Sequence, residues 1–271
     1  MARWTLDDIP WERFDPAKVD PDLLRIVKAA SLVEYDGGGY AEFLCRVFHD
    51  DPDFPDMARR WGEEEIQHGV ALARWAKLAD PGYDLDSAFA RFKAGYDNGL
   101  GGDRSQRGSR SGEMIARCMV EVGTSSYYTA LAEAAEEPVL KAVCHKIAAD
   151  ELRHYKLFYG YANRYLERER VGLLGRLRVA LGRIAESEDD ELAYAYYAAN
   201  ENAAPYDRRR FNAEYVRRAY AVYRPHHVER GMAMIFKAVG LTPHGRLNGV
   251  ANWIAWRMMQ RRVARLQKAA A

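Results

Sequence analysis

The sequence predicts an all-α protein. Apolar residues recur every three or four positions over long segments, and runs of β-branched residues are scarce. Short stretches rich in Pro, Gly and Asp separate these segments. We therefore expect long helices at about 20–48, 55–79, 111–136 and 138–169, followed by several helices from about 171 to 267.

The breaks between the predicted helices indicate two helical hairpins. HDDPDFPD (49–56) and EEP (136–138) are short turns, whereas the connection over 80–110 is far longer and includes a Gly/Ser/Arg-rich loop at 99–112. A long crossover lets a second hairpin pack beside the first. We expect one domain over 1–271, with a bundle core at about 20–170 and an extra helical region at about 171–267.

The composition is that of a soluble globular protein, with 48% hydrophobic and 29% charged residues in 271. No apolar signal-peptide core follows the N-terminus, and no stretch approaches the roughly 18 apolar residues of a spanning helix. We expect a cytoplasmic protein without stable membrane insertion. The three cysteines, Cys45, Cys118 and Cys144, lack the paired spacings of a zinc or rubredoxin-like site and are expected in the core.

Two Glu-x-x-His motifs carry the functional signal. Glu65 and His68 form one, and Glu151 and His154 form the other. Residues three apart share one helix face and can hold one ion between them. A single Glu–His pair is more often a solvated helix face, so the interpretation depends on both copies and on their surroundings.

A lone glutamate stands level with each motif. The midpoint of Glu34 and Glu65 falls in the 49–56 turn, and the midpoint of Glu121 and Glu151 falls at the 136–138 turn. Antiparallel helices rise equally per residue, so residues equidistant from a turn lie at the same height. Four carboxylates and two imidazoles then converge, which is the ligand set of a di-iron or di-manganese centre in a helical bundle. We expect two Fe ions, with Mn or a mixed Fe/Mn pair as the alternative.

Two further acidic residues precede the motif glutamates. Glu64 and Asp150 are placed to accept a hydrogen bond from a ligating histidine across the helix pairs. Such a bond orients the imidazole of a metal ligand.

These residues resemble those of the ferritin-like di-iron carboxylate proteins, and the nearest in motif are the soluble acyl-carrier-protein desaturases. The resemblance rests on EEEIQHG (63–69), EVGT (121–124) and KIAADELRH (146–154), and it covers about residues 30–170. It implies a ferritin-like four-helix bundle with additional C-terminal helices. It also implies iron ligation by the six residues above and a role for Thr124 near the oxygen-binding face. Gln67 departs from the arginine usual in those desaturases.

The resemblance implies an enzyme, a di-metal oxidoreductase that activates O₂ to desaturate or oxygenate an organic substrate, for which an acyl chain is one candidate. The chain has no GxGxxG fingerprint and no cysteine cluster, so electrons must come from an external reductase or ferredoxin. The alternatives are a rubrerythrin-like peroxide-reducing protein, disfavoured by the missing rubredoxin-like cysteine pairs, and an iron-binding ferritin-like protein. A scaffold without metal is disfavoured because all six ligands are present.

Residues beside the ligands leave two interpretations open. Gly37 and Gly38, in a run of three glycines, either open a channel for substrate or oxygen, or mark close helix packing or a local break. Trp61 and Tyr128 either line the pocket, carry electrons or fill the core, and core filling is the commoner fate of such aromatics.

The C-terminal part is basic. Residues 161–271 hold 20 Lys+Arg against 11 Asp+Glu, a balance of +9, although the whole chain is +1. Its arginine clusters, Arg208–Arg210, Arg217–Arg218 and Arg261–Arg262, either pair with the acidic first 160 residues or receive an acidic protein such as an acyl carrier or a ferredoxin. No motif for nucleic acid accompanies them.

Residues 246–266 form an amphipathic segment with two tryptophans and several arginines. We expect it to dock against the bundle or a second subunit rather than on a membrane surface, because most such helices cover a core. A homodimer is the expected assembly.

Overall fold

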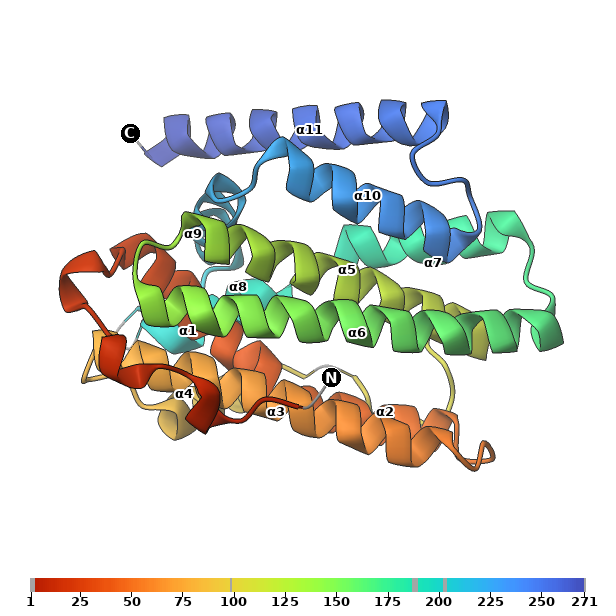
Figure 1. Cartoon of the computed structure of the whole chain (residues 1–271), viewed down its shortest axis with the longest axis horizontal. Coiled ribbons are helices and arrows are strands. Elements are labelled where there is room, and N and C mark those ends of the chain that lie inside the picture. Colours follow the sequence, from red (N-terminus) through yellow and green to blue (C-terminus); the bar gives the residue numbers. More distant parts are fainter. Residues whose placement is uncertain (1–2, 98, 187–189, 202–203, 271) are drawn as a thin grey trace. The chain divides into compact units, whose positions relative to one another are not determined.

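The computed structural model describes residues 3–97, 99–186, 190–201 and 204–270, and these form helices and loops without a β-strand (Figure 1). The prediction of an all-α protein is confirmed. Three short 3-10 helices within Leu6–Lys18 precede the α-helices. The α-helices are α1 (Pro21–Tyr35), α2 (Gly37–Val47), α3 (Phe54–Ala79), α4 (Leu85–Gly95), α5 (Arg110–Ala134), α6 (Pro138–Glu169), α7 (Leu173–Glu186), α8 (Asp190–Asn200), α9 (Arg208–Ala221), α10 (Pro225–Val239) and α11 (Arg246–Ala270).

The chain forms two compact units. Unit 1 comprises Met1–Asp103, Leu131–Lys146 and Glu188–Arg218, and unit 2 comprises Arg104–Ala130, Ile147–Ser187 and Ala219–Ala271. Each unit draws on separate stretches of the sequence, so neither is a simple N-terminal or C-terminal half. The expectation of one domain over the whole chain stays a prediction.

The first hairpin belongs to unit 1, where α1 and α2 pack against α3 across the predicted turn (Figure 1). The predicted single helix over 20–48 is two helices, because the chain breaks at Asp36 before the three glycines. The Asp36 carboxylate accepts hydrogen bonds from Lys93 Nζ at 3.0 and 3.2 Å. This tertiary contact fixes the break in place.

Close packing between these helices depends on glycine. A Cβ added at Gly69 of α3 would lie 2.6 Å from the Tyr35 backbone nitrogen and 2.8 Å from the Ser31 carbonyl oxygen of α1. A Cβ at Gly37 would overlap the Cβ of Glu65. Gly37 therefore serves close helix packing next to a local break, which is one of the two interpretations drawn from the sequence. No channel is needed to explain it.

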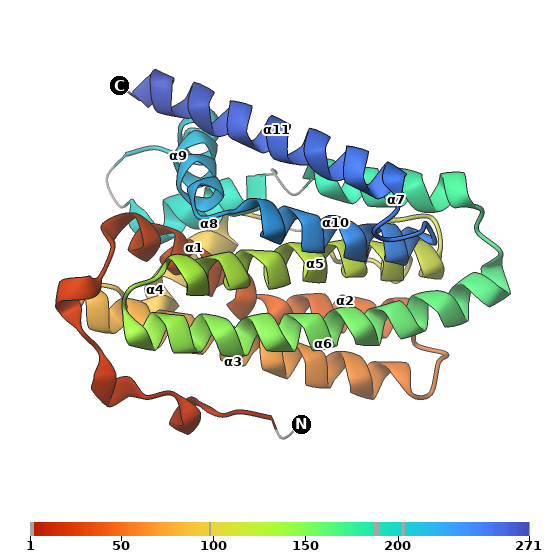
Figure 2. The same cartoon turned by 45° about the horizontal axis from the view of Figure 1, so that its top comes forward.

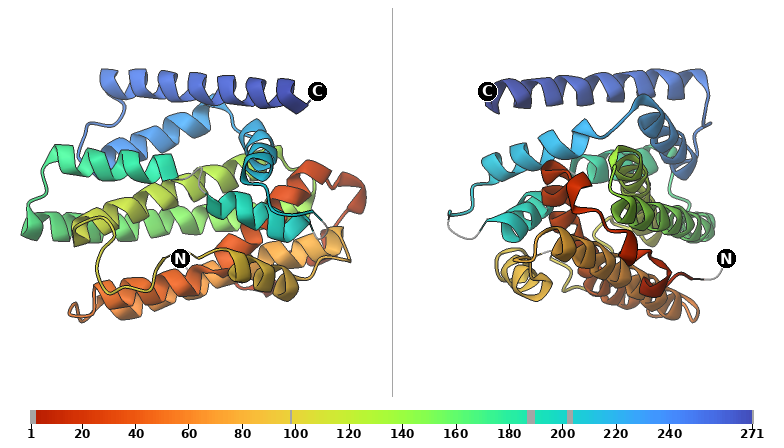
Figure 3. Two further views of the ribbon diagram at one scale, coloured as in Figure 1. Left: turned by 180° about the vertical axis from the view of Figure 1, so that it is seen from behind. Right: turned by 60° about the vertical axis from the view of Figure 1, so that its left-hand side comes forward.

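Helix α4 was not expected, because the sequence suggested only a long connection over 80–110. Asp84 starts the helix by accepting a hydrogen bond from the Ser87 backbone N–H at 2.9 Å. Ala88 and Phe92, one turn apart, are buried, and α4 packs against α8 (Figure 3). Two buried positions in eleven residues are too few to show a helical period, so the sequence could not distinguish this helix from a loop.

The start of α6 is anchored within unit 1 by a buried carboxylate. Glu137 accepts hydrogen bonds from the Leu140 backbone N–H and the Trp75 indole N–H, both at 2.7 Å, and from the Asp15 backbone N–H at 3.2 Å. Three donors compensate the burial of this charge, and they tie α6 to α3 and to the N-terminal segment.

Helices α5 and α6 form the second predicted hairpin, whose turn lies at 135–137. The turn end of this hairpin belongs to unit 1, and the open end belongs to unit 2. Glu169 near the end of α6 accepts hydrogen bonds from the backbone N–H groups of Arg110 and Ser111 at 3.0 and 2.8 Å. A carboxylate at a helix N-terminus satisfies unpaired donors and favours the helix dipole. This contact shows that the helices are antiparallel.

The C-terminal helices of unit 2 cover this hairpin. Helix α10 packs against α7 and α11 and runs beside α5 (Figure 2). The Tyr155 hydroxyl of α6 donates to the Met234 carbonyl of α10 at 2.8 Å, and Gly231 of α10 lies against Ser126 of α5. Arg107 forms a two-point ion pair with Glu186 at the end of α7, with both N–O distances at 2.6 Å.

No helix in the described ranges combines the length and the apolar character that crossing a bilayer requires. The finding agrees with the absence of an apolar run in the sequence.

The glycine contact in unit 1 gives a first prediction. We expect Gly69→Ala to lower the free energy of unfolding by about 1–3 kcal/mol, because backbone atoms of α1 cannot move aside as a flexible side chain can. Gly160→Ala is the matched control, since no atom lies within 4 Å of its added Cβ, and it should raise stability by up to about 1 kcal/mol. Urea unfolding measures both. Equal effects at the two positions would show that the close approach at Gly69 is not tight.

Candidate metal centre

Unit 1 brings Glu34, Glu65 and His68 together. Glu34 lies near the end of α1, and Glu65 and His68 lie one turn apart on α3. His68 Nδ1 is 3.5 Å from Glu34 Oε2, and one potential ligand atom of each residue lies within 4.8 Å of the others. All three side chains are buried. The three residues thus lie at the same height along the hairpin, as expected from the turn midpoint. We call this set triad 1.

Unit 2 contains the corresponding triad 2, formed by Glu121 on α5 with Glu151 and His154 on α6. His154 Nδ1 is 3.7 Å from Glu121 Oε2 and 3.9 Å from Glu151 Oε2. One potential ligand atom of each residue again lies within 4.8 Å of the others, and all three side chains are buried. Each of the two hairpins thus builds the same donor set, two carboxylates and an imidazole.

The electrostatics of triad 2 show what this burial costs. Burial, together with the neighbouring Glu151 carboxylate, raises the pKa of Glu121 to about 8, although His154 acts in the opposite direction. Two carboxylates in a dry interior cannot both stay ionised without a compensating positive charge. A proton or a cation must therefore accompany triad 2 near neutral pH.

Thr124 contacts a candidate ligand. Its hydroxyl lies 2.6 Å from Glu151 Oε2 and donates a hydrogen bond to that carboxylate across the hairpin. The hydroxyl is also near the carbonyl oxygens of Val120 and Glu121, at 3.2 and 3.3 Å. What these distances establish is a role in orienting Glu151; the catalytic role expected from the resemblance stays a prediction.

Glu64 and Asp150 are both buried, as expected for residues beside a metal site. Within unit 1, Glu64 forms an ion pair with Arg3, and within unit 2, Asp150 pairs with Arg153 at 2.5 Å. These arginines supply positive charge next to each Glu-x-x-His motif. The predicted hydrogen bonds to histidines across the helix pairs stay a prediction.

The N-terminal segment contributes a residue that sequence reasoning missed. The Trp4 ring stacks on His68, with ring centroids 6.0 Å apart and planes inclined by 5°. Gln67 holds this segment in place by donating to the Trp4 carbonyl at 3.0 Å. Gln67 stands where the acyl-carrier-protein desaturases usually have arginine. Its structural role here is to anchor the N-terminal segment. Trp4 lies outside the periodic segments, so the sequence does not indicate which residue it contacts. Only the structure identifies His68 as its partner.

Aromatic and sulfur side chains near the triads are buried. Trp61 and Tyr128 are at most 3% exposed, which agrees with the core-filling interpretation. All three cysteines are buried thiols, as expected, and burial raises the pKa of the Cys118 and Cys144 thiols. Raised pKa values keep these thiols protonated and poorly suited to metal ligation at neutral pH.

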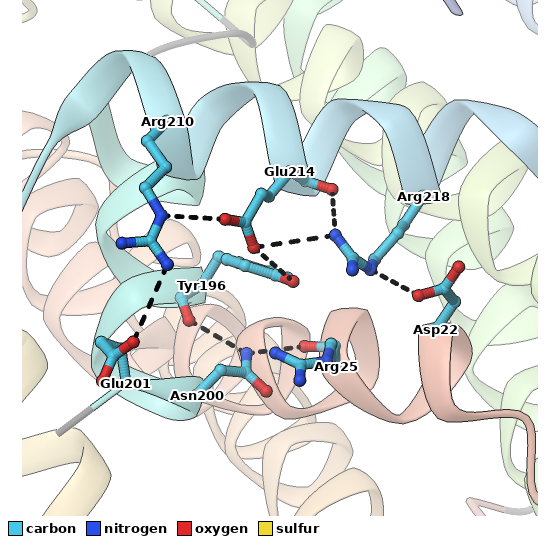
Figure 4. Close-up of polar contacts among 8 residues, drawn as sticks. All are labelled: Asp22, Arg25, Tyr196, Asn200, Glu201, Arg210, Glu214 and Arg218. Carbon is cyan, nitrogen blue, oxygen red and sulfur yellow. Dashed lines mark hydrogen bonds and ion pairs between the residues drawn. The ribbon is translucent and has the colours of Figure 1, made fainter. Parts of the chain in front are cut away.

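Three arginines of α9, Arg208, Arg210 and Arg218, have carboxylate partners within unit 1. Arg210 Nε lies 3.1 Å from Glu214 Oε1, and Arg218 Nε lies 2.7 Å from Asp22 Oδ1 (Figure 4). Arg208 lies 3.6 Å from Asp190. The sequence left open whether this cluster pairs internally or receives an acidic partner. Internal pairing reduces the field that α9 offers to a partner, and docking of an acidic protein there stays a prediction.

No known family model matches the sequence, and no curated protein is significantly similar to it. The resemblance to ferritin-like di-iron proteins therefore rests on the sequence motifs and stays a prediction.

The Thr124 contact gives a second prediction. We expect Thr124→Val to lower the free energy of unfolding of the metal-free protein by roughly 1–3 kcal/mol, because the buried Glu151 carboxylate loses a charge-assisted hydrogen bond. Thr124→Ser keeps the hydroxyl and should stay close to the parent. Urea unfolding in the presence of a chelator measures the difference. If valine and serine have the same effect, the hydroxyl does not stabilise Glu151.

Proposed function

We propose that this protein is a di-metal carboxylate oxidoreductase, in which the two triads face each other in a ferritin-like four-helix bundle and hold two metal ions. The observation that carries the proposal is the repetition of one buried donor set, Glu–Glu–His, in two hairpins. Iron is the expected metal, with manganese or a mixed pair as the alternative. Carboxylate and imidazole ligands suit these ions, whereas thiolates would favour zinc or iron–sulfur clusters.

The residues present fit such a centre. Each triad offers three side-chain ligands, which is fewer than the ligands that iron usually takes and leaves positions for exogenous groups. Burial keeps bulk water away and strengthens the attraction between carboxylates and cations. Two divalent cations would balance the four carboxylates.

The neighbouring side chains of the chain orient and enclose the ligands. The Thr124 hydroxyl fixes one oxygen of Glu151, and the Trp4 ring covers His68 and excludes water from that side. Arg3 and Arg153 place positive charge beside Glu64 and Asp150. These contacts restrict the movement of the ligands before any ion binds.

When bound, the pair of ions supplies the redox chemistry by which dioxygen is reduced and an organic C–H or N–H bond is oxidised. The sequence contains no dinucleotide fingerprint and no cysteine cluster, so an external reductase or ferredoxin provides the electrons in this proposal. The organic substrate belongs to a class that desaturation or oxygenation can modify, and an acyl chain is the candidate that the motif resemblance favours.

Metal stoichiometry is the third prediction. We expect close to two metal ions per chain after reconstitution with Fe(II) without oxygen, and close to none in Glu65→Ala/Glu151→Ala, because each triad then loses a carboxylate. Glu63→Ala/Glu167→Ala is the matched control, since both glutamates are exposed on the same two helices. Elemental analysis gives the ratio. Unchanged metal content in the double variant of triad residues would falsify the assignment.

Single variants distinguish one shared centre from two separate sites. If the triads share a centre, Glu65→Ala alone weakens binding of both ions, because the second cation helps to neutralise the carboxylates that surround the first. If the triads bind independently, Glu65→Ala leaves one ion at full affinity in triad 2. Titration with Fe(II) under anaerobic conditions separates these outcomes.

Reaction with oxygen is the fourth prediction. We expect the Fe(II)-loaded protein to consume dioxygen faster than iron-loaded Glu65→Ala/Glu151→Ala, and to sustain consumption only when a reductase or ferredoxin is added together with a reductant that keeps this carrier reduced. An oxygen electrode measures the rate, and product analysis on candidate substrates identifies the bond that is oxidised. Reaction with hydrogen peroxide but not with dioxygen would instead favour the peroxide-reducing alternative.

A further inference from the structure

Helix α11 exposes a row of large apolar side chains. Leu247, Val250, Trp253, Ile254 and Met258 are between 45% and 65% exposed. Their spacing of three or four residues places them on one side of the helix. We call these five residues the exposed stripe.

The opposite side of α11 accounts for its contact with α10. Trp256, Met259, Val263 and Leu266 are half-buried at the same helical spacing, and the helices pack together within unit 2 (Figure 2). The expectation that this segment docks on neighbouring helices therefore explains one side of α11. The exposed stripe lies on the other side.

The charge of α11 has one sign. The side that carries the exposed stripe continues toward the C-terminus with exposed Arg257, Arg261, Arg265 and Lys268. Residues 246–271 contain no Asp or Glu. The Arg257 guanidinium lies over the Trp253 ring, 5.4 Å from its centroid, so cationic and apolar groups meet in the middle of the helix.

We propose that α11 is a membrane-surface helix that holds this protein on bilayers rich in anionic lipid. The helix lies parallel to the bilayer, the exposed stripe enters the boundary between head groups and acyl chains, and the arginines contact lipid phosphates. Trp253 suits this depth because its ring is apolar and its N–H is polar. Such surface association requires no helix to cross the bilayer.

A lipid surface fits this face better than a second copy of the chain. Two copies meeting through α11 would bring like charges together, which is unfavourable in a desolvated interface. The exposed stripe also comprises only five residues, whereas each partner of a stable complex contributes about 20–30. An anionic bilayer supplies an apolar layer and negative charge together.

Vesicle flotation with the full chain tests this proposal. The probes are vesicles of phosphatidylcholine alone and of phosphatidylcholine mixed with phosphatidylglycerol. We expect the protein to float with the mixed vesicles at low salt, and binding to weaken as salt increases, because salt screens the attraction between arginines and lipid phosphates. Failure to float with the mixed vesicles at low salt overturns the proposal.

Two variants separate the apolar and cationic contributions. Trp253→Ala/Met258→Ala should weaken binding at least about tenfold through lost apolar contact. Arg257→Gln/Arg261→Gln should weaken binding to mixed vesicles roughly fivefold per charge, about thirtyfold for the pair. These residues are exposed, and circular dichroism verifies that each variant remains helical. Full binding by both variants overturns the proposal.

Matched controls remove similar groups elsewhere. Leu78→Ala removes an apolar side chain that is 40% exposed in unit 1, and Arg208→Gln/Arg209→Gln removes two exposed charges from α9; both should bind like the parent. Sedimentation velocity tests the second copy as the occupant. A dimer that Trp253→Ala/Met258→Ala converts to monomers, together with absent flotation, assigns the exposed stripe to a subunit interface and overturns the lipid proposal.

Discussion

The cost of burying carboxylates close together is the constraint on which this fold depends. Glu34, Glu65, Glu121 and Glu151 are at most 8% exposed, yet a carboxylate in a dry interior is stable only when donors or cations accompany it. Glu137 shows the solution that uses protein donors alone, since three N–H groups surround it. The triads instead gather carboxylates around an imidazole. This contrast, rather than burial by itself, distinguishes a candidate metal centre from a structural carboxylate.

The sequence predicted the hairpins and the members of each triad because these features have a period. Helical spacing places Glu65 with His68 and Glu151 with His154, and the turn midpoints bring Glu34 and Glu121 level with them. Both regularities follow from helix geometry and need no knowledge of tertiary contacts. This is why the local composition of triads 1 and 2 could be deduced before their distances were known.

The remaining features depend on tertiary contacts that no periodic pattern in the sequence indicates. The break at Asp36 is fixed by Lys93, which is distant in sequence, and α4 is stabilised by packing against α8 rather than by a long apolar pattern. Trp4 reaches His68 from a non-helical segment. In each case the tertiary partner determines the structure, so local sequence signals were insufficient.

The basic C-terminal part illustrates why charge counts need a structure before they indicate a partner. The balance of +9 over residues 161–271 includes arginines of two kinds. Arg210 and Arg218 of α9 have carboxylate neighbours in unit 1, so much of their field is cancelled nearby. Arg257 and Arg261 of α11 are exposed in a segment without acidic residues, next to exposed apolar side chains. A surface that combines uncancelled charge with apolar area selects a partner that offers both, so α11 is a stronger candidate for an interaction surface than the larger arginine cluster on α9.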